Sequence, residues 1–381
     1  MNVISVSQII NRYNYSIGFD REDVGTSELE ARWENIFIIY ALNGMGKTNF
    51  LKLIYFFSNF SAENLVKLLR IPFTRYSVKY SDHLYAAIDK DVKKDEFTLR
   101  VIEVIDSRPI VRLEVTESIK GFSAEDYAEN DKLSKVEEIL MGQEHRVTFL
   151  ATDRTLYTGK SLRQILGDLE NLVNEKINQI LSEKIVKQSE GLLGISHQDL
   201  LDRYKSLEEL ISDNSVIIRE VDVVRSASSA LATIEDPSRE VLEYFANNLY
   251  LYSQIADLQS KINLFLDCVN RNLLHNNIDY ADGRFILESG KLKIPPSDLS
   301  SGENNLLYIF STLLKEIILQ GDLVIIDEPE ISLGLEWREK FLTNISKFIE
   351  GSGVKILLAS HSMEVLGEFP TDFLETAGGE E

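Results

Sequence analysis

The chain has 381 residues, 44% of them hydrophobic, which is enough to bury one large core or two medium ones. Its single cysteine, Cys268, excludes a disulfide framework and a multi-cysteine metal site. The net charge of -21, from 40 basic and 61 acidic residues, weighs against a free-standing nucleic-acid binder and suits either solubility or docking of a basic partner.

The first predicted elements are short strands that lead to a glycine-rich loop. An aromatic-rich stretch covers 13–19, a polar loop follows over 20–27, and the apolar run 35–40 predicts a buried strand. Residues 41–48 then read ALNGMGKT, and the apolar side chains after them recur at helical spacing. Strand, turn and helix in this order are the context that a phosphate-binding loop requires.

The loop contains the residue types that phosphate binding needs. Glycines let backbone N–H groups approach a phosphate without a Cβ in the way, Lys47 reaches the β- and γ-phosphates, and the Thr48 hydroxyl is a ligand for Mg²⁺. Ala41 stands where the strict pattern has glycine, which the loop tolerates better than loss of Gly46. The predicted nucleotide-binding residues here are Asn43, Gly44, Met45, Gly46, Lys47, Thr48 and Asn49.

The middle of the chain changes pattern twice. Alternating apolar residues over 76–117 predict an antiparallel meander, the acidic stretch 123–138 is expected to be exposed, and 146–151 read as a buried strand that ends at Asp153 and Arg154. Between 161 and 275, apolar residues at helical spacing predict helices. These helices form either an antiparallel arm of about 45 Å, from roughly 30 residues each way, or a lobe packed on the rest.

The chain becomes strand-rich again after 280, where 284–294 read as a hairpin. Ser300, Ser301 and Gly302 follow and introduce a predicted helix over 304–319. Ser300 with Glu303 has the pattern of a capping box, which is one interpretation. The other is that small residues at the positive end of a helix bind an anion. The position of this segment, shortly before a strand that ends in two acids, favours binding of a γ-phosphate.

Two later strands precede the candidate catalytic residues. The apolar run 323–326 predicts a central parallel strand, which places Asp327 and Glu328 at the carboxyl edge of a sheet, where ligands bind. We expect Asp327 to hold Mg²⁺ and Glu328 to polarise the attacking water. His361 follows the apolar strand 354–359 and is expected to contact the γ-phosphate.

The segments ALNGMGKT, LSSGE, VIIDEPEISL and LASHS resemble the Walker A, signature, Walker B and switch-histidine motifs of ABC-type ATPases. The similarity is to the SMC and RecF-like class and, within it, to short ATPases related to the OLD family, and it covers 1–60 and 283–370. It implies an α/β ATPase head with a mixed or parallel core sheet, an antiparallel meander and an inserted helical arm or lobe. The expected domains are two halves of the head, 1–160 and 280–381, around an insertion over 161–279, and the expected cofactors are ATP and Mg²⁺.

The resemblance also implies partners. In this class the signature of one subunit completes the ATP site of another, so Ser300, Ser301 and Gly302 are expected to act across a homodimer or larger homo-oligomer. No nuclease motif follows His361, and short ATPases of this kind resemble sensor subunits of bacterial anti-phage systems such as PARIS and Septu, which act with a separate nuclease or toxin.

Two other functions share these motifs. A RecF- or SMC-like repair ATPase predicts turnover that DNA stimulates. A transporter nucleotide-binding subunit fits less well, because residues 49–299 far exceed its usual spacing between loop and signature. Residues 1–5 lack the features of a signal peptide, and no stretch approaches about 18 uninterrupted apolar residues, so we expect a cytoplasmic protein without membrane contact.

Overall fold

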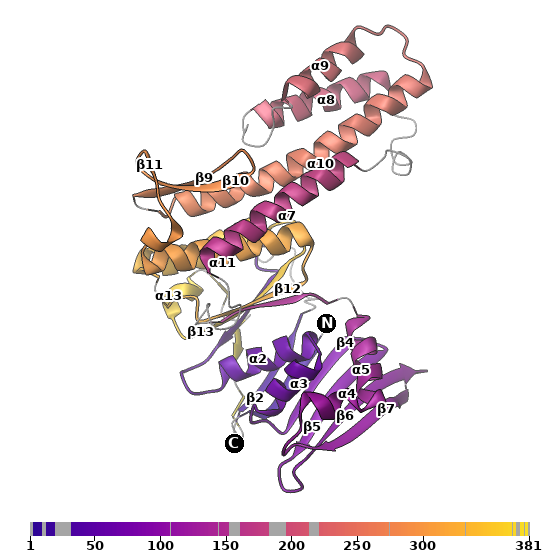
Figure 1. Cartoon of the computed structure of the whole chain (residues 1–381), viewed down its shortest axis with the longest axis vertical. Helices are drawn as coiled ribbons and strands as arrows, with labels where there is room; N and C mark the ends of the chain where they lie inside the picture. The colour runs from indigo at the N-terminus through magenta and orange to yellow at the C-terminus, as the bar shows by residue number, and fades with distance from the viewer. Residues whose placement is uncertain are drawn as a thin grey trace. The chain divides into compact units, whose positions relative to one another are not determined.

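The structure is a computed structural model, and it forms two compact units: Met1–Gly159 with Leu319–Glu381, and Lys160–Ile318 (Figure 1). The expected polar loop 20–27 and the strand end at Asp153 and Arg154 lie outside the described residues. Residues 280–318, which the sequence assigned to the C-terminal half of the head, belong to the second unit. The described residues are 3–9, 13–19, 32–106, 108–143, 145–151, 161–182, 196–212, 221–273, 275–331, 333–367, 369–370, 374–376 and 378–379.

The first unit contains a parallel sheet with the strand order β14-β3-β13-β12-β8. Its central strands are the continuous apolar runs of the sequence, and their side chains are buried whichever way they point, as a parallel sheet covered on both faces requires. The strands are β3 (Ile36–Tyr40), β8 (Val147–Leu150), β12 (Leu323–Asp327), β13 (Lys355–Ser360) and β14 (Leu374–Thr376).

An antiparallel sheet forms the other layer of this unit, with the order β15-β2-β1-β4-β5-β6-β7. The expected meander is its larger part, and β1 joins it by pairing with β4. Alternation of buried and exposed positions along β4 shows that one face packs into the core. The strands are β1 (Val3–Ile9), β2 (Tyr13–Gly18), β4 (Arg75–Ser81), β5 (Leu84–Asp91), β6 (Glu96–Ile105), β7 (Arg108–Ser118) and β15 (Gly378–Gly379).

Helix α2 (Lys47–Ser58) joins the two sheets into one core. It contacts β1 of the antiparallel sheet and β8, β12 and β13 of the parallel sheet. Phe50, Leu53 and Phe57 are fully buried on it, and they belong to one hydrophobic cluster with residues of both sheets. The helix that follows the glycine-rich loop is therefore held by both sheets. This also fixes the position of the loop, which leads into the N-terminus of the helix.

The acidic stretch 123–138 is mostly exposed, as the sequence predicted, and it is helical. It forms α4 (Ala124–Ala128) and much of α5 (Asp131–Met141), whose N-termini are capped by Ser123 and Asn130. A few apolar residues at helical spacing form a buried face among the charges: Tyr127, Leu133, Val136 and Leu140. The remaining helices of this unit are α3 (Ala62–Leu69), α12 (Leu335–Ile349) and α13 (Met363–Leu366).

The second unit is mainly helical. Helix α7 (Leu162–Ser182) packs along α10 (Arg239–Asn270), as in an arm, while α8 (His197–Ser212) and α9 (Val221–Ala232) pack with α10 as a small bundle (Figure 1). Tyr204 is at the centre of that bundle, and its hydroxyl donates to the Phe245 carbonyl at 2.8 Å. The unit also contains β9 (Asn276–Ala281), β10 (Arg284–Ser289), β11 (Leu292–Lys293), the short η2 (Pro296–Asp298) and α11 (Ser301–Leu319).

These layers confirm the predicted fold class. The protein is α/β, with a parallel core sheet, an antiparallel meander and an inserted helical region. None of the helices in the described ranges has the length and apolar character needed to cross a bilayer.

Candidate active site

Three neighbouring strands of the parallel sheet place the sequence motifs at one edge. Strand β13 lies between β3 and β12, with Ser360 opposite Tyr40 and Ala359 opposite Asp327. The glycine-rich loop follows β3, Glu328 follows β12 and His361 follows β13. Because parallel strands end at the same edge, the motifs of 41–48, 327–328 and 361 converge there, where open α/β sheets bind ligands.

The loop itself has the backbone that a phosphate cradle needs. Gly44 and Gly46 have φ angles of 84° and 87°, in the left-handed region that favours glycine. A Cβ added at Gly44 would meet nothing within 4 Å, so there is open space beside the loop. Asn43, Met45 and Asn49 lie in this loop and the first turn of α2, as the sequence predicted.

Tyr15 supports the loop from the antiparallel sheet. Its ring stacks on Phe50 with a centroid separation of 5.0 Å, and its hydroxyl donates to the Met45 carbonyl at 2.8 Å. Burial raises the pKa of Tyr15 to about 12, so the hydroxyl remains a donor at neutral pH. Sequence reasoning did not single out Tyr15, whose only signal was its place in an aromatic-rich strand.

Lys47 is a buried cation at the base of the loop. Its side chain is 4% exposed, and its Nζ donates to the carbonyl oxygens of Ala41 at 2.5 Å and Leu42 at 3.1 Å. Burial lowers the pKa of Lys47, and the carboxylates of Glu328, Asp327 and Glu330 oppose that shift. The ammonium group is therefore held by the loop carbonyls and stabilised by the charge of three acids.

Two oxygen atoms beside the loop have the spacing of neighbouring Mg²⁺ ligands. Thr48 Oγ1 donates to Asp327 Oδ2 at 2.8 Å, and Asp327 is 1% exposed. Adjacent ligands in an octahedral Mg²⁺ shell with bonds of about 2.05 Å lie about 2.9 Å apart, so this spacing suits two such ligands. Within the described ranges no group of three or more His, Cys, Asp or Glu could hold a metal alone. A site here needs phosphate and water oxygens, which is how Mg²⁺ is usually bound.

Glu328 and His361 face each other at the same edge. Glu328 has a φ of 46°, a conformation that costs energy for a residue with a side chain, and its N–H donates to the Ala359 carbonyl at 2.9 Å. His361 Nδ1 lies 3.6 Å from Glu328 Oε1 and 3.1 Å from Glu330 Oε1. Glu330, which the sequence analysis did not assign a role, is therefore the nearer carboxylate.

The predicted signature residues lie in the second unit, at the start of α11. The helix begins at Ser301 and not at Asn304, because Ser300 and Glu303 form a capping box. Ser300 Oγ donates to Glu303 Oε2 at 2.7 Å, and the Glu303 N–H donates back to Ser300 Oγ at 3.3 Å. Gly302 follows in the first turn. The capping interpretation is thus seen in the structure, and the role of Ser300, Ser301 and Gly302 toward a γ-phosphate stays a prediction.

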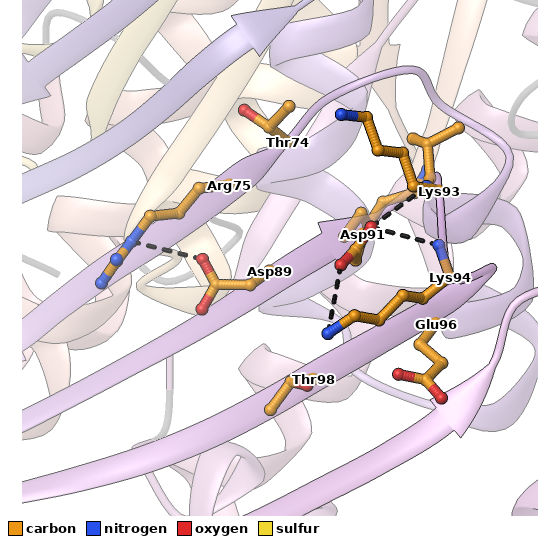
Figure 2. A pocket seen from close by; sticks show the side chains of 10 residues that line it. Thr74, Arg75, Asp89, Asp91, Lys93, Lys94, Glu96 and Thr98 are labelled. Atoms are coloured by element: carbon orange, nitrogen blue, oxygen red, sulfur yellow. Dashed lines mark hydrogen bonds and ion pairs between the residues drawn. The ribbon is translucent and has the colours of Figure 1, made fainter.

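A cavity of about 610 Å³ lies on the antiparallel sheet (Figure 2). Four of its charged side chains form two ion pairs: Arg75 Nε lies 3.7 Å from Asp89 Oδ1, and Lys94 Nζ lies 3.7 Å from Asp91 Oδ2. Lys90, from β5, donates from Nζ to the carbonyls of residues 69 and 71 at 2.8 Å. The cavity is therefore explained by the packing and pairing of the sheet.

Comparison with known families identifies the domain. Residues 36–367 match the family model described as "AAA domain, putative AbiEii toxin, Type IV TA system". The chain belongs to this AAA-domain family. The match runs from β3 through α13, so the AAA domain includes the glycine-rich loop, Asp327, Glu328 and His361.

Solved structures similar to this AAA domain include two Smc heads. One is the Smc head domain of Pyrococcus furiosus with an extended coiled coil, bound to the C-terminal domain of ScpA, with a TM-score of 0.42 and 12% identity over 100% of this chain and 96% of that chain. The other is the SmcHead bound to the C-winged helix domain of ScpA, with a TM-score of 0.40 and 10% identity over 100% and 97%. No curated protein matches the AAA domain at a significant level.

Proposed function

We propose that this AAA domain binds ATP together with Mg²⁺ and hydrolyses it. The observation that carries the proposal is the convergence, at one sheet edge, of a buried lysine in a glycine-rich loop, a Thr48–Asp327 oxygen pair at 2.8 Å, and Glu328. Membership of an AAA-domain family supports it.

Each residue has a role that its surroundings suit. The backbone of 43–49 cradles the phosphates, and the Lys47 ammonium exchanges its carbonyl partners for β- and γ-phosphate oxygens. Thr48 and Asp327 hold Mg²⁺, which when bound neutralises phosphate charge. Glu328 orients the attacking water as general base, and His361 contacts the γ-phosphate.

Nucleotide titration tests the assignment of the loop. Lys47→Ala removes the cation placed for the β- and γ-phosphates, so we expect it to abolish ATP binding. Lys340→Ala is the matched control, because Lys340 is an exposed lysine of the same unit that pairs with Glu336 at 3.0 Å. Equal affinity of the wild type and Lys47→Ala would refute the assignment.

We propose further that the active form is a homodimer or larger homo-oligomer in which Ser300, Ser301 and Gly302 complete the site of a second subunit. The presence of these small residues at the positive end of a 19-residue helix supports this role. Mixing Lys47→Ala chains with Ser301→Arg chains tests it, since each is inactive alone while a mixed dimer has one intact site. Recovered hydrolysis supports the proposal. A mixture that stays inactive, with both proteins folded and associated, contradicts it.

The biological setting is proposed to be a two-component defence system, in which this ATPase is the sensor and a separate nuclease or toxin is the effector. The description of the family, which names a toxin and a toxin–antitoxin system, supports a role of this kind. Affinity purification of the tagged wild type from cells that carry its neighbouring genes tests it, because the effector should copurify in a fixed ratio. Turnover that DNA stimulates, without a bound protein, would favour the repair alternative.

A further inference from the structure

Glu330 is a buried carboxylate to which the proposed chemistry gives no role. It is 3% exposed, although it lies only three residues beyond the end of β12. The Ile331 N–H donates to the Glu328 carbonyl at 3.2 Å, which closes a turn through Pro329 and returns the chain toward the sheet. A buried charge is costly unless donors and opposite charges surround it, so its contacts indicate what it does.

Within the described residues, the hydrogen bonds of Glu330 lead to the end of β13. Its Oε1 accepts from Ser360 Oγ at 2.8 Å and from the His361 N–H at 3.1 Å. The Ser362 N–H donates in turn to Ser360 Oγ at 3.0 Å. One carboxylate therefore fixes the backbone on which the imidazole stands.

The His361 ring completes this group of contacts. Its Nδ1 is 3.1 Å from Glu330 Oε1, within hydrogen-bonding distance, whereas Glu328 Oε1 at 3.6 Å is beyond it. The ring N–H is not aligned with the nearer oxygen, and in the described part of the chain both Nδ1 and Glu330 Oε2 are buried without a hydrogen-bond partner. A small realignment would let the ring N–H donate to Glu330, since catalytic hydrogen bonds often tighten when a site is loaded.

We propose that Glu330 is the positioning residue for His361. It holds the histidine backbone by a hydrogen bond and accepts the ring proton on Nδ1, which fixes the orientation of the imidazole. It also keeps the imidazole from bonding to Glu328, whose carboxylate stays available to orient water. The proposal rests on the ATPase function proposed above, and one arm of its test is independent of that function.

The first arm is a double-mutant cycle on ATP hydrolysis. Glu330→Gln keeps the volume and one acceptor oxygen, and we expect it to lower kcat by about 10–100-fold, as loss of an outer partner of a functional histidine does, with ATP affinity changed less than about twofold. In a His361→Ala background, adding Glu330→Gln should lower kcat by less than a further factor of about two. The control is Glu339→Gln, an exposed carboxylate of α12 in the same unit. Equal losses in both backgrounds would overturn the proposal.

The second arm measures the tautomer of the His361 imidazole by NMR in ligand-free protein. With ¹⁵N-labelled histidine, His361 is assigned by the signal that disappears in His361→Ala. The wild type should carry its proton on Nδ1, and Glu330→Met, which has no acceptor oxygen, should move it to Nε2, while Glu339→Gln leaves it unchanged. The same tautomer in the wild type and Glu330→Met overturns the proposal even if ATP is hydrolysed. A wild type without ATPase activity refutes the proposed function, and the NMR result then decides the role of Glu330 alone.

Discussion

Replacing Thr48 with valine tests the oxygen pair at the heart of the site. Valine has the shape of threonine without its hydroxyl, so the variant removes the donor that lies 2.8 Å from Asp327 Oδ2. Asp327 is 1% exposed, and water cannot readily replace the lost donor. A hydrogen bond to a charged group contributes about 1.5–3 kcal/mol, so the free energy of unfolding should fall by that amount. The melting temperature should fall by about 3–12 °C for a unit of this size.

The same substitution removes a proposed Mg²⁺ ligand. In the presence of ATP, the Mg²⁺ concentration at half-maximal binding should rise at least about tenfold, which corresponds to about 1.4 kcal/mol. Thr48→Ser is the matched control, because it keeps the hydroxyl and should change both quantities little. Calorimetry without nucleotide and Mg²⁺ titration with nucleotide measure the two effects. If serine lowers stability as much as valine, or if valine leaves the Mg²⁺ requirement unchanged, the pairing of Thr48 with Asp327 does not have the proposed role.

Three further changes test the surroundings of the site and the cavity on the antiparallel sheet. Tyr15→Phe keeps the stacking but removes the hydrogen bond to the Met45 carbonyl, so unfolding should cost about 0.5–1.5 kcal/mol less and ATP affinity should fall; equal affinity in a titration would show that the loop does not need this support. Gly44→Ala meets no clash, so its expected destabilisation of about 1–2 kcal/mol comes from the positive φ alone, and an unchanged urea midpoint would contradict that. Burial lowers the pKa of Lys90 from 10.5 to about 8, and the neutral amine can still donate to both of its carbonyl partners. Between these two pKa values the unfolded chain therefore binds more protons than the folded chain, so the folded state gains stability as the pH rises. The free energy of unfolding of the wild type, relative to that of Lys90→Met, should rise from pH 7.5 to 9.5. An equal difference between the two proteins at both pH values would refute this.

Most of the site could be predicted because its residues directly follow apolar runs. Buried parallel strands are continuously apolar, so 35–40, 323–326 and 354–359 were recognisable without an alternating pattern. The residue after each strand then falls at the carboxyl edge by topology alone. For the same reason the sequence placed Asp327 and Glu328 at the carboxyl edge and His361 directly after another strand, and in the structure the two strands are parallel neighbours.

What the sequence did not predict depends on contacts between distant residues. Tyr15 bonds to a residue 30 positions away, and the bond from the His361 N–H to Glu330 spans 31, so neither has a local pattern. In 123–138, a narrow buried face was hidden by many acidic residues. At Ser300 the pattern is local, so the capping box was visible in the sequence. A segment that binds a γ-phosphate has the same local pattern, so the sequence could not separate the two roles.

The most direct test of the central proposal compares bound nucleotide and released phosphate in the wild type and Glu328→Gln. The substitution keeps the shape of the side chain and leaves Lys47, Thr48 and Asp327 in place, so ATP and Mg²⁺ should bind as tightly as in the wild type. Loss of the general base should slow phosphate release by about 10²–10⁴-fold, so ATP-bound protein should accumulate. Phosphate release at the wild-type rate, with ATP bound, would mean that the carboxyl edge of β12 does not carry the catalytic base.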